Sequence, residues 1–108
     1  MPFVSVVTPF YNTAEYLAEC IESVLRQDHA NFEYLLADNC STDGSLEIAE
    51  RYAAQDARIR VIPHAAFVDQ DANYNRALGY SSGTSRYVKM AQADDVLMPG
   101  CLTEMVRL

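Results

Sequence analysis

The chain contains no tryptophan, only three cysteines, and only four glycines and four prolines among its 108 residues. So little glycine and proline excludes a collagen-like or low-complexity chain. The cysteines are Cys20, Cys40 and Cys101; they form no CxxC pair, which argues against a disulfide framework and for ordinary thiols. No apolar run approaches the roughly 20 residues that cross a bilayer. Half of the residues are nevertheless apolar, which is typical of a packed domain.

Positive charge is also scarce, because eight Lys and Arg stand against fifteen Asp and Glu, giving a net charge of -7. Such a surface repels a phosphate backbone, so we expect no nucleic-acid partner. A smaller phosphorylated ligand would need a cation or backbone amides to offset the same repulsion. The N-terminal segment lacks the basic start of a signal peptide. We therefore expect a cytoplasmic location, with a membrane-associated full-length parent as the alternative.

Strand-like and helix-like segments alternate along the chain. β-branched and apolar runs predict strands at residues 4–9, 32–37, 59–62 and 87–91. Apolar residues at helical spacing predict helices at residues 12–26, 46–53, 73–81 and 99–106. Asn12 and Glu15 have the spacing of a capping box at the start of the first helix. This alternation predicts an α/β fold with a mostly parallel sheet and helices on both faces.

Polar residues gather where the predicted strands end. They are residues 8–12 after the first strand, Asp38 and Asn39 after the second, and Asp94 and Asp95 after the fourth. Ligands of such sheets bind outside the carboxyl ends of the strands. No GxGxxG or GxxxxGK[ST] motif is present, so neither a dinucleotide fingerprint nor a P-loop is predicted.

Asp94 and Asp95 are the strongest chemical signal. Adjacent carboxylates at a strand end provide the oxygen ligands that Mg²⁺ or Mn²⁺ prefers. A bound cation would neutralise a diphosphate that the acidic chain otherwise repels. The alternative is an acidic turn in which Asp95 caps the segment that follows.

The other candidates also have two interpretations. Asp38 and Asn39 either accept hydrogen bonds from a ribose or base, or begin an Asx-turn. Tyr11 either stacks on a nucleobase or packs over the edge of the sheet. Asp43 is interpreted as a helix cap.

The order of several segments resembles the GT-A-fold glycosyltransferases of family 2, over essentially the whole chain. The matching segments are residues 4–12, 16–27, 31–33, 38–45, 58–61, 75–78 and 83–99. The resemblance implies that Pro9, Tyr11 and Asp38 line the base and ribose pocket of a nucleotide-sugar. Asp94 and Asp95 resemble the end of a DxD-type motif that contacts ribose and the metal–diphosphate. Arg76 lies in a segment that borders the donor site.

Three positions depart from the family pattern. Asn39 and Cys40 stand where the family usually has Asp and Gly, and Gln92 stands where it often has the first Asp of Asp-x-Asp-Asp. Asn39 can still accept from a base N–H. Cys40 would strain the turn if this position requires a positive φ.

The resemblance implies the nucleotide-sugar-binding part of a glycosyltransferase with a Rossmann-like sheet, residues 1–108 being the N-terminal portion of a longer domain. The expected donor is a nucleoside-diphosphate sugar, with UDP-sugars favoured, and the expected cofactor is Mn²⁺ or Mg²⁺. Transfer is expected to invert the anomeric centre, with a general base beyond Leu108 and a glycan or lipid acceptor. The apolar side of the last helix suggests self-association as an alternative to truncation. Two further alternatives are a binding-only nucleotide module and a receiver-type phospho-accepting domain, although the latter needs an acidic pair after the first strand.

Overall fold

The computed structural model describes residues 3–28, 31–64, 66–80, 87–93 and 96–107. Within these ranges, strands and helices alternate from end to end. The strands are β1 (Val4–Phe10), β2 (Phe32–Asp38), β3 (Ile59–Pro63) and β4 (Tyr87–Met90). The helices are α1 (Ala14–Leu25), α2 (Ser45–Ala53), α3 (Gln70–Leu78) and α4 (Cys101–Arg107).

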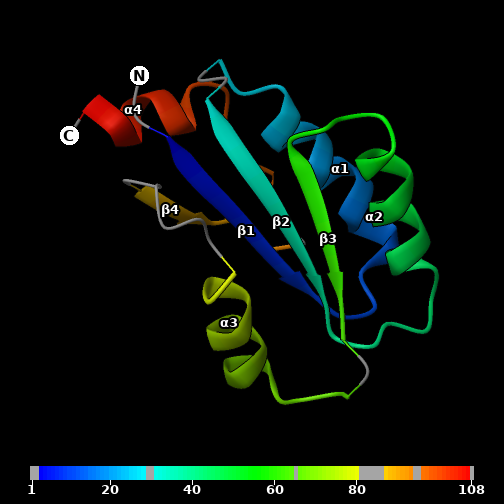
Figure 1. The fold of residues 1–108 in the computed structure, drawn as a ribbon. Helices are drawn as coiled ribbons and strands as arrows, with labels where there is room; N and C mark the ends of the chain where they lie inside the picture. The colour runs from blue at the N-terminus through cyan, green and yellow to red at the C-terminus, as the bar shows by residue number, and fades with distance from the viewer. Residues whose placement is uncertain (1–2, 29–30, 65, 81–86, 94–95, 108) are drawn as a thin grey trace.

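The strands form one sheet in the order β3-β2-β1-β4, and every pairing within it is parallel. The predicted parallel sheet is therefore confirmed. In Figure 1 the arrowheads of β1, β2 and β3 point to the same edge of the sheet. We call this edge, formed by residues 10–12, 38–40 and 63–64, the carboxyl edge.

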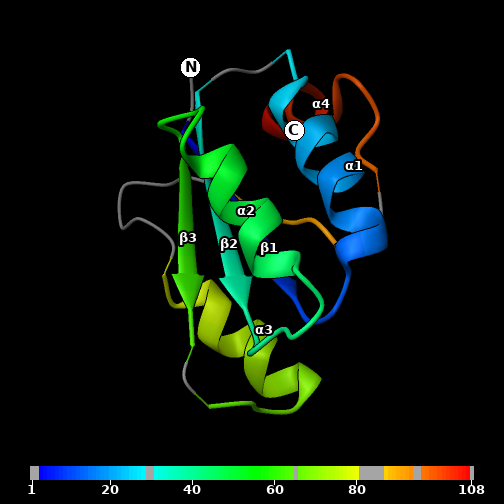
Figure 2. The same ribbon diagram turned by 90° about the vertical axis from the view of Figure 1, so that its right-hand side faces the viewer.

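Helices cover both faces of the sheet, as predicted. α1 and α2 lie side by side over one face, while α3 lies on the opposite face against β1 and β2 (Figures 1 and 2). Neighbouring residues of a strand point to opposite faces. Val6 accordingly joins the larger core cluster, which also contains Leu102 of α4, and Val7 joins a smaller cluster with Ala77 of α3.

The start of α3 differs from the prediction of a helix at residues 73–81. The helix begins at Gln70, because the carboxylate of Asp69 accepts a hydrogen bond from the backbone N–H of Ala72 at 2.8 Å. An Asp side chain at this position satisfies an N–H that has no partner inside the helix. The first turn of α3 is polar, so the apolar spacing gave no signal for it.

A buried hydroxyl pair lies inside the larger core. The hydroxyl of Tyr34 on β2 lies 2.9 Å from the hydroxyl of Thr8 on β1, and both residues are fully buried. Burial raises the pKa of Tyr34 well above its usual value. Two buried hydroxyls that bond to each other avoid the cost of an unsatisfied polar group.

None of the helices in the described ranges is both long enough and apolar enough to cross a membrane.

Candidate functional site

Three chain segments leave the sheet together at the carboxyl edge. The strand register pairs Phe10 with Asp38 and Asp38 with Pro63. The backbone N–H of Asn39 donates to the carbonyl of Phe10 at 2.9 Å, which extends the pairing by one step. The residues that follow the three strands are therefore brought side by side, as the parallel sheet predicts.

Asp38 is buried and stabilises the turn that it begins. One of its carboxylate oxygens accepts a hydrogen bond from the backbone N–H of Ser41 at 3.0 Å. Its backbone carbonyl lies 3.0 Å from Nδ1 of His64, at the end of β3. Asp38 thus stabilises a turn, as one of its two interpretations has it, and its contact with a ribose or base stays a prediction.

The side chain of Asn39 binds the loop between β3 and α3. Its Nδ2 donates to the carbonyl of Val68 at 2.8 Å, and its Oδ1 accepts from the N–H of Val68 at 3.0 Å. Asn39 is only 3% exposed. Its amide therefore already has partners within the chain.

Arg76 reaches from α3 to the same place. Its guanidinium donates to Asn39 Oδ1 and Asn73 Oδ1, both at 3.2 Å, and to the carbonyl of Ala66 at 3.3 Å. Its Nε is buried and has no hydrogen-bond partner within the described part of the chain. Three residues predicted from the sequence thus lie together: Asp38, Asn39 and Arg76. Arg76 places a positive charge at this site, although the net charge of the protein is -7.

Two aromatic rings stand at the carboxyl edge. The rings of Tyr11 and Phe67 meet edge to face, with centroids 4.9 Å apart and planes 66° apart. They remain 45% and 59% exposed, respectively. Pro9, by contrast, is buried within β1 and pairs with Ala37. Phe67 was missed by the sequence reasoning, because its contact with Tyr11 joins residues far apart in the sequence.

Cys40 occupies a left-handed backbone conformation, with φ of 61°. The turn therefore requires a positive φ at position 40, which favours glycine, so the strain expected of Cys40 is present. The thiol of Cys40 donates to the carbonyl of His64 at 2.9 Å, which ties the turn to the end of β3.

The predicted capping box of α1 is wrong. Thr13 is the N-cap residue and makes no side-chain cap bond, whereas Asn12 has φ of 50° and its Oδ1 accepts from the N–H of Thr42 at 2.7 Å. The first amides of α1 are satisfied by the 41–45 loop instead: Ser45 Oγ accepts from Thr13 N–H, and Asp43 Oδ2 accepts from Ala14 N–H.

The carboxylate of Asp43 accepts hydrogen bonds at the start of both α1 and α2. Besides the Ala14 amide, its other carboxylate oxygen accepts from both the N–H and the hydroxyl of Ser45 at the start of α2. These bonds, above all the one from the Ser45 hydroxyl, lower the pKa of Asp43. The N-cap residue of α2 is Gly44, so the helix-cap interpretation of Asp43 is right only in that its carboxylate accepts from the first amides of α1 and α2. A position beside the N-termini of two helices is favourable for a negative charge.

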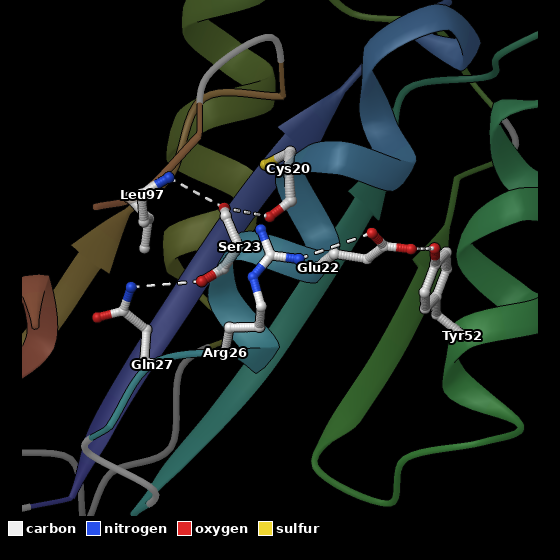
Figure 3. A network of polar contacts seen from close by, with 7 residues as sticks. All are labelled: Cys20, Glu22, Ser23, Arg26, Gln27, Tyr52 and Leu97. Atoms are coloured by element: carbon white, nitrogen blue, oxygen red, sulfur yellow. Dashed lines mark hydrogen bonds and ion pairs between the residues drawn. The ribbon is translucent and has the colours of Figure 1, made fainter. Parts of the chain in front are cut away.

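One side of α1 holds the segment between β4 and α4. Ser23 Oγ accepts from the N–H of Leu97 at 2.9 Å and donates to the carbonyl of Cys20 (Figure 3). Gln27 donates to the carbonyl of Met98 and accepts from the N–H of Leu102, each at 2.9 Å. The thiol of Cys20 donates to the carbonyl of Gln92 at 3.2 Å.

These bonds fix the chain on both sides of residues 94 and 95. Asp94 and Asp95, the predicted metal ligands, lie outside the described residues. Among the residues that the structure does describe, no group of three His, Cys, Asp or Glu side chains could hold a metal ion. The assignment of Asp94 and Asp95 as metal ligands stays a prediction.

The sequence matches the family model described as "Glycosyl transferase family 2" over residues 5–108. Glycosyltransferase GlyG of Streptococcus pneumoniae is 37% identical over 94 residues, which cover 87% of this chain and 31% of that protein. The putative glycosyltransferase EpsE of Bacillus subtilis is 39% identical over 106 residues, which cover 97% of this chain and 37% of that protein. The chain thus spans about a third of the length of these relatives.

Solved structures share the fold. S. aureus TarS in complex with UDP-GlcNAc superposes with a TM-score of 0.81 at 26% identity, over 99% of this chain and 30% of that one. A mannosyltransferase from Pyrobaculum calidifontis, in complex with GDP-Man and Mn²⁺, has a TM-score of 0.86 at 23% identity, over 96% of this chain and 31% of that one. These neighbours are GT-A glycosyltransferases, so the predicted GT-A-like fold is confirmed.

Proposed function

Because this chain belongs to glycosyl transferase family 2, we propose that it binds the nucleoside-diphosphate sugar from which a glycosyltransferase transfers the sugar. The observation that carries the proposal is the meeting of Tyr11, Asp38, Asn39 and Arg76 at the carboxyl edge. An aromatic face, a carboxylate and a guanidinium suit a nucleobase, a ribose and a phosphate, respectively. The complex of TarS with UDP-GlcNAc supports a nucleoside-diphosphate sugar as the ligand.

A divalent cation completes the proposal. Asp94 and Asp95 would hold Mn²⁺ or Mg²⁺, because a pair of carboxylates is a donor set that both ions accept. When bound, the cation would screen the charge of the diphosphate and stabilise it as the leaving group. The net charge of -7 makes such screening favourable for binding a diphosphate. The mannosyltransferase complex, which contains Mn²⁺, supports metal use within this fold.

The remaining steps concern the whole enzyme. We propose direct displacement with inversion at the anomeric carbon, in which a carboxylate outside residues 1–108 removes the proton of the acceptor hydroxyl. The acceptor would be a glycan or a lipid. A binding-only module without metal chemistry is the second candidate. The specific observation that favours it is the amide of Asn39 at a position where a carboxylate is usual in the family.

Calorimetric titration of UDP, GDP and dTDP, each with and without Mn²⁺, tests the proposal. We expect Mn²⁺-dependent binding, with UDP preferred, and its loss in Asp95→Ala. Glu19→Ala, which removes the same charge from the exposed side of α1, should bind like the wild type. Binding that does not depend on Mn²⁺ would support the binding-only module. A folded chain that binds none of the nucleotides would contradict both.

A further inference from the structure

The loop between β3 and α3 carries Phe67 without the support of regular structure. Backbone N–H and C=O groups in such a loop need partners elsewhere. Two side chains provide them: Asn39 bonds to both the N–H and the carbonyl of Val68, and Arg76 donates to the carbonyl of Ala66. Val68 is therefore tied to the carboxyl edge through Asn39, and Ala66 is tied to α3 through Arg76.

Packing does not fix the ring of Phe67 by itself. The side chain is 59% exposed, and the contact that orients it is the edge-to-face meeting with Tyr11. Because a ring this exposed gains little from burial, its position depends on where the backbone holds it. Asn39, which is 3% exposed, is the buried anchor of that backbone.

An amide can make this pair of contacts, whereas an ionised carboxylate cannot. One end of the Asn39 side chain must donate to the Val68 carbonyl, and the other must accept from the Val68 N–H. A carboxylate has acceptors at both ends. With Asp at position 39, an oxygen would face the Val68 carbonyl, and the short 2.8 Å contact would become repulsive.

The departure of position 39 from the family pattern thus has a structural consequence. We propose that Asn39 is a positioning residue, which holds Phe67 against Tyr11 so that the two rings, which meet edge to face, form two adjoining sides of the site for the base of a nucleoside diphosphate. This inference rests on the proposed function. It assigns to Phe67 a role in base binding, and to Asn39 a role that it exerts through Phe67.

Arg76 offers a favourable partner to an Asp at position 39, so Asn39→Asp can be used to test the role of Asn39. Its guanidinium donates to Asn39 Oδ1 at 3.2 Å and would pair with a carboxylate there. Asn39→Asp therefore exchanges the contact with the Val68 carbonyl for a stronger contact with Arg76. We expect the loop to loosen while the stability of the fold changes little.

A fluorescent probe tests the positioning directly. The chain has no tryptophan, so Phe67→Trp introduces a single one. We expect high steady-state anisotropy of this indole, and a clear fall when Asn39→Asp is added. Asn75→Asp, which adds the same charge on an exposed position of α3, should leave the anisotropy unchanged. Equal anisotropy with Asn and Asp at position 39 would overturn the inference.

Nucleotide affinity tests the consequence, with native Phe67 in place. We expect Asn39→Asp to weaken UDP binding about tenfold, the size of one lost aromatic stacking contact. In a Phe67→Leu background, Asn39→Asp should cost almost nothing more, because the ring through which Asn39 acts is gone. An undiminished loss in that background would mean that the added charge acts directly, and would overturn the inference alone. If the wild type binds no nucleotide, the proposed function fails, and the role in base binding fails with it.

Discussion

The hydroxyl of Ser23 accepts a hydrogen bond from the backbone N–H of Leu97, a residue 74 positions later in the chain. The same hydroxyl donates to the carbonyl of Cys20. Ser23 is 2% exposed, so water cannot replace either contact. A single buried oxygen thereby joins α1 to the segment that follows residues 94 and 95.

Ser23→Ala should destabilise the fold. The substitution leaves the N–H of Leu97 and the carbonyl of Cys20 without this partner in a buried place, which costs about 1–3 kcal/mol. Urea unfolding followed by circular dichroism measures the difference. Ser41→Ala is the matched control: its hydroxyl accepts from the Asn12 N–H at an exposed site, so the change should stay within about 0.5 kcal/mol. Equal losses in the two variants would show that burial does not matter here.

The larger pattern of the fold could be predicted from the sequence because it depends on local periodicity. The β-branched run from Val4 and the helical spacing behind Leu17 identify β1 and α1, and the strand–helix alternation implies the parallel order. Polar residues at strand ends then gather at one edge for geometric reasons alone. The place of Asp38 and Asn39 at this edge could therefore be predicted without a structure.

Contacts between distant residues could not be predicted in this way. Asn12 and Glu15 have a capping spacing, yet the amides of α1 bond to Asp43 and Ser45, about thirty positions away. Likewise, nothing near Asn39 in the sequence indicates Val68 as its partner. Phe67 was missed for the same reason, because only the loop fold places it beside Tyr11.

Cys40→Gly should stabilise the turn relative to Cys40→Ala. Both variants lose the thiol contact with the His64 carbonyl, but only glycine relieves the left-handed backbone at φ of 61°. A residue with a Cβ in this conformation costs about 1–2 kcal/mol. Thermal and urea unfolding of the two variants should therefore differ by about 1 kcal/mol in favour of glycine. A more stable alanine variant would show that the turn adapts without strain.

The stability of the fold should depend on Asp43 in the acidic range. Its pKa is lowered in the folded chain, chiefly by the hydrogen bond from Ser45, from an ordinary value of 3.8. The contribution of the carboxylate is thus fully present above pH 3.8 and is lost as the pH falls through the lowered pKa.

Asp43→Asn removes this titration. We expect the difference in unfolding free energy between wild type and variant to be constant above about pH 5 and to shrink towards about pH 2. Urea unfolding at a series of pH values measures it. Glu50→Gln, on the exposed side of α2, serves as the control with the same loss of charge. A difference that grows on acidification would contradict the assigned direction.

Tyr11→Ala should weaken nucleotide binding, while the equally exposed Tyr16 offers a matched control. The two side chains are 45% and 49% exposed, but Tyr11 stands at the carboxyl edge against Phe67, and Tyr16 lies on α1. If the base stacks on Tyr11, its loss should lower the affinity for UDP about tenfold, and Tyr16→Ala should leave it unchanged. Calorimetry with Mn²⁺ present measures both. A loss of similar size in the two variants would point to a general effect on the fold, and an unchanged Tyr11→Ala would place the base elsewhere.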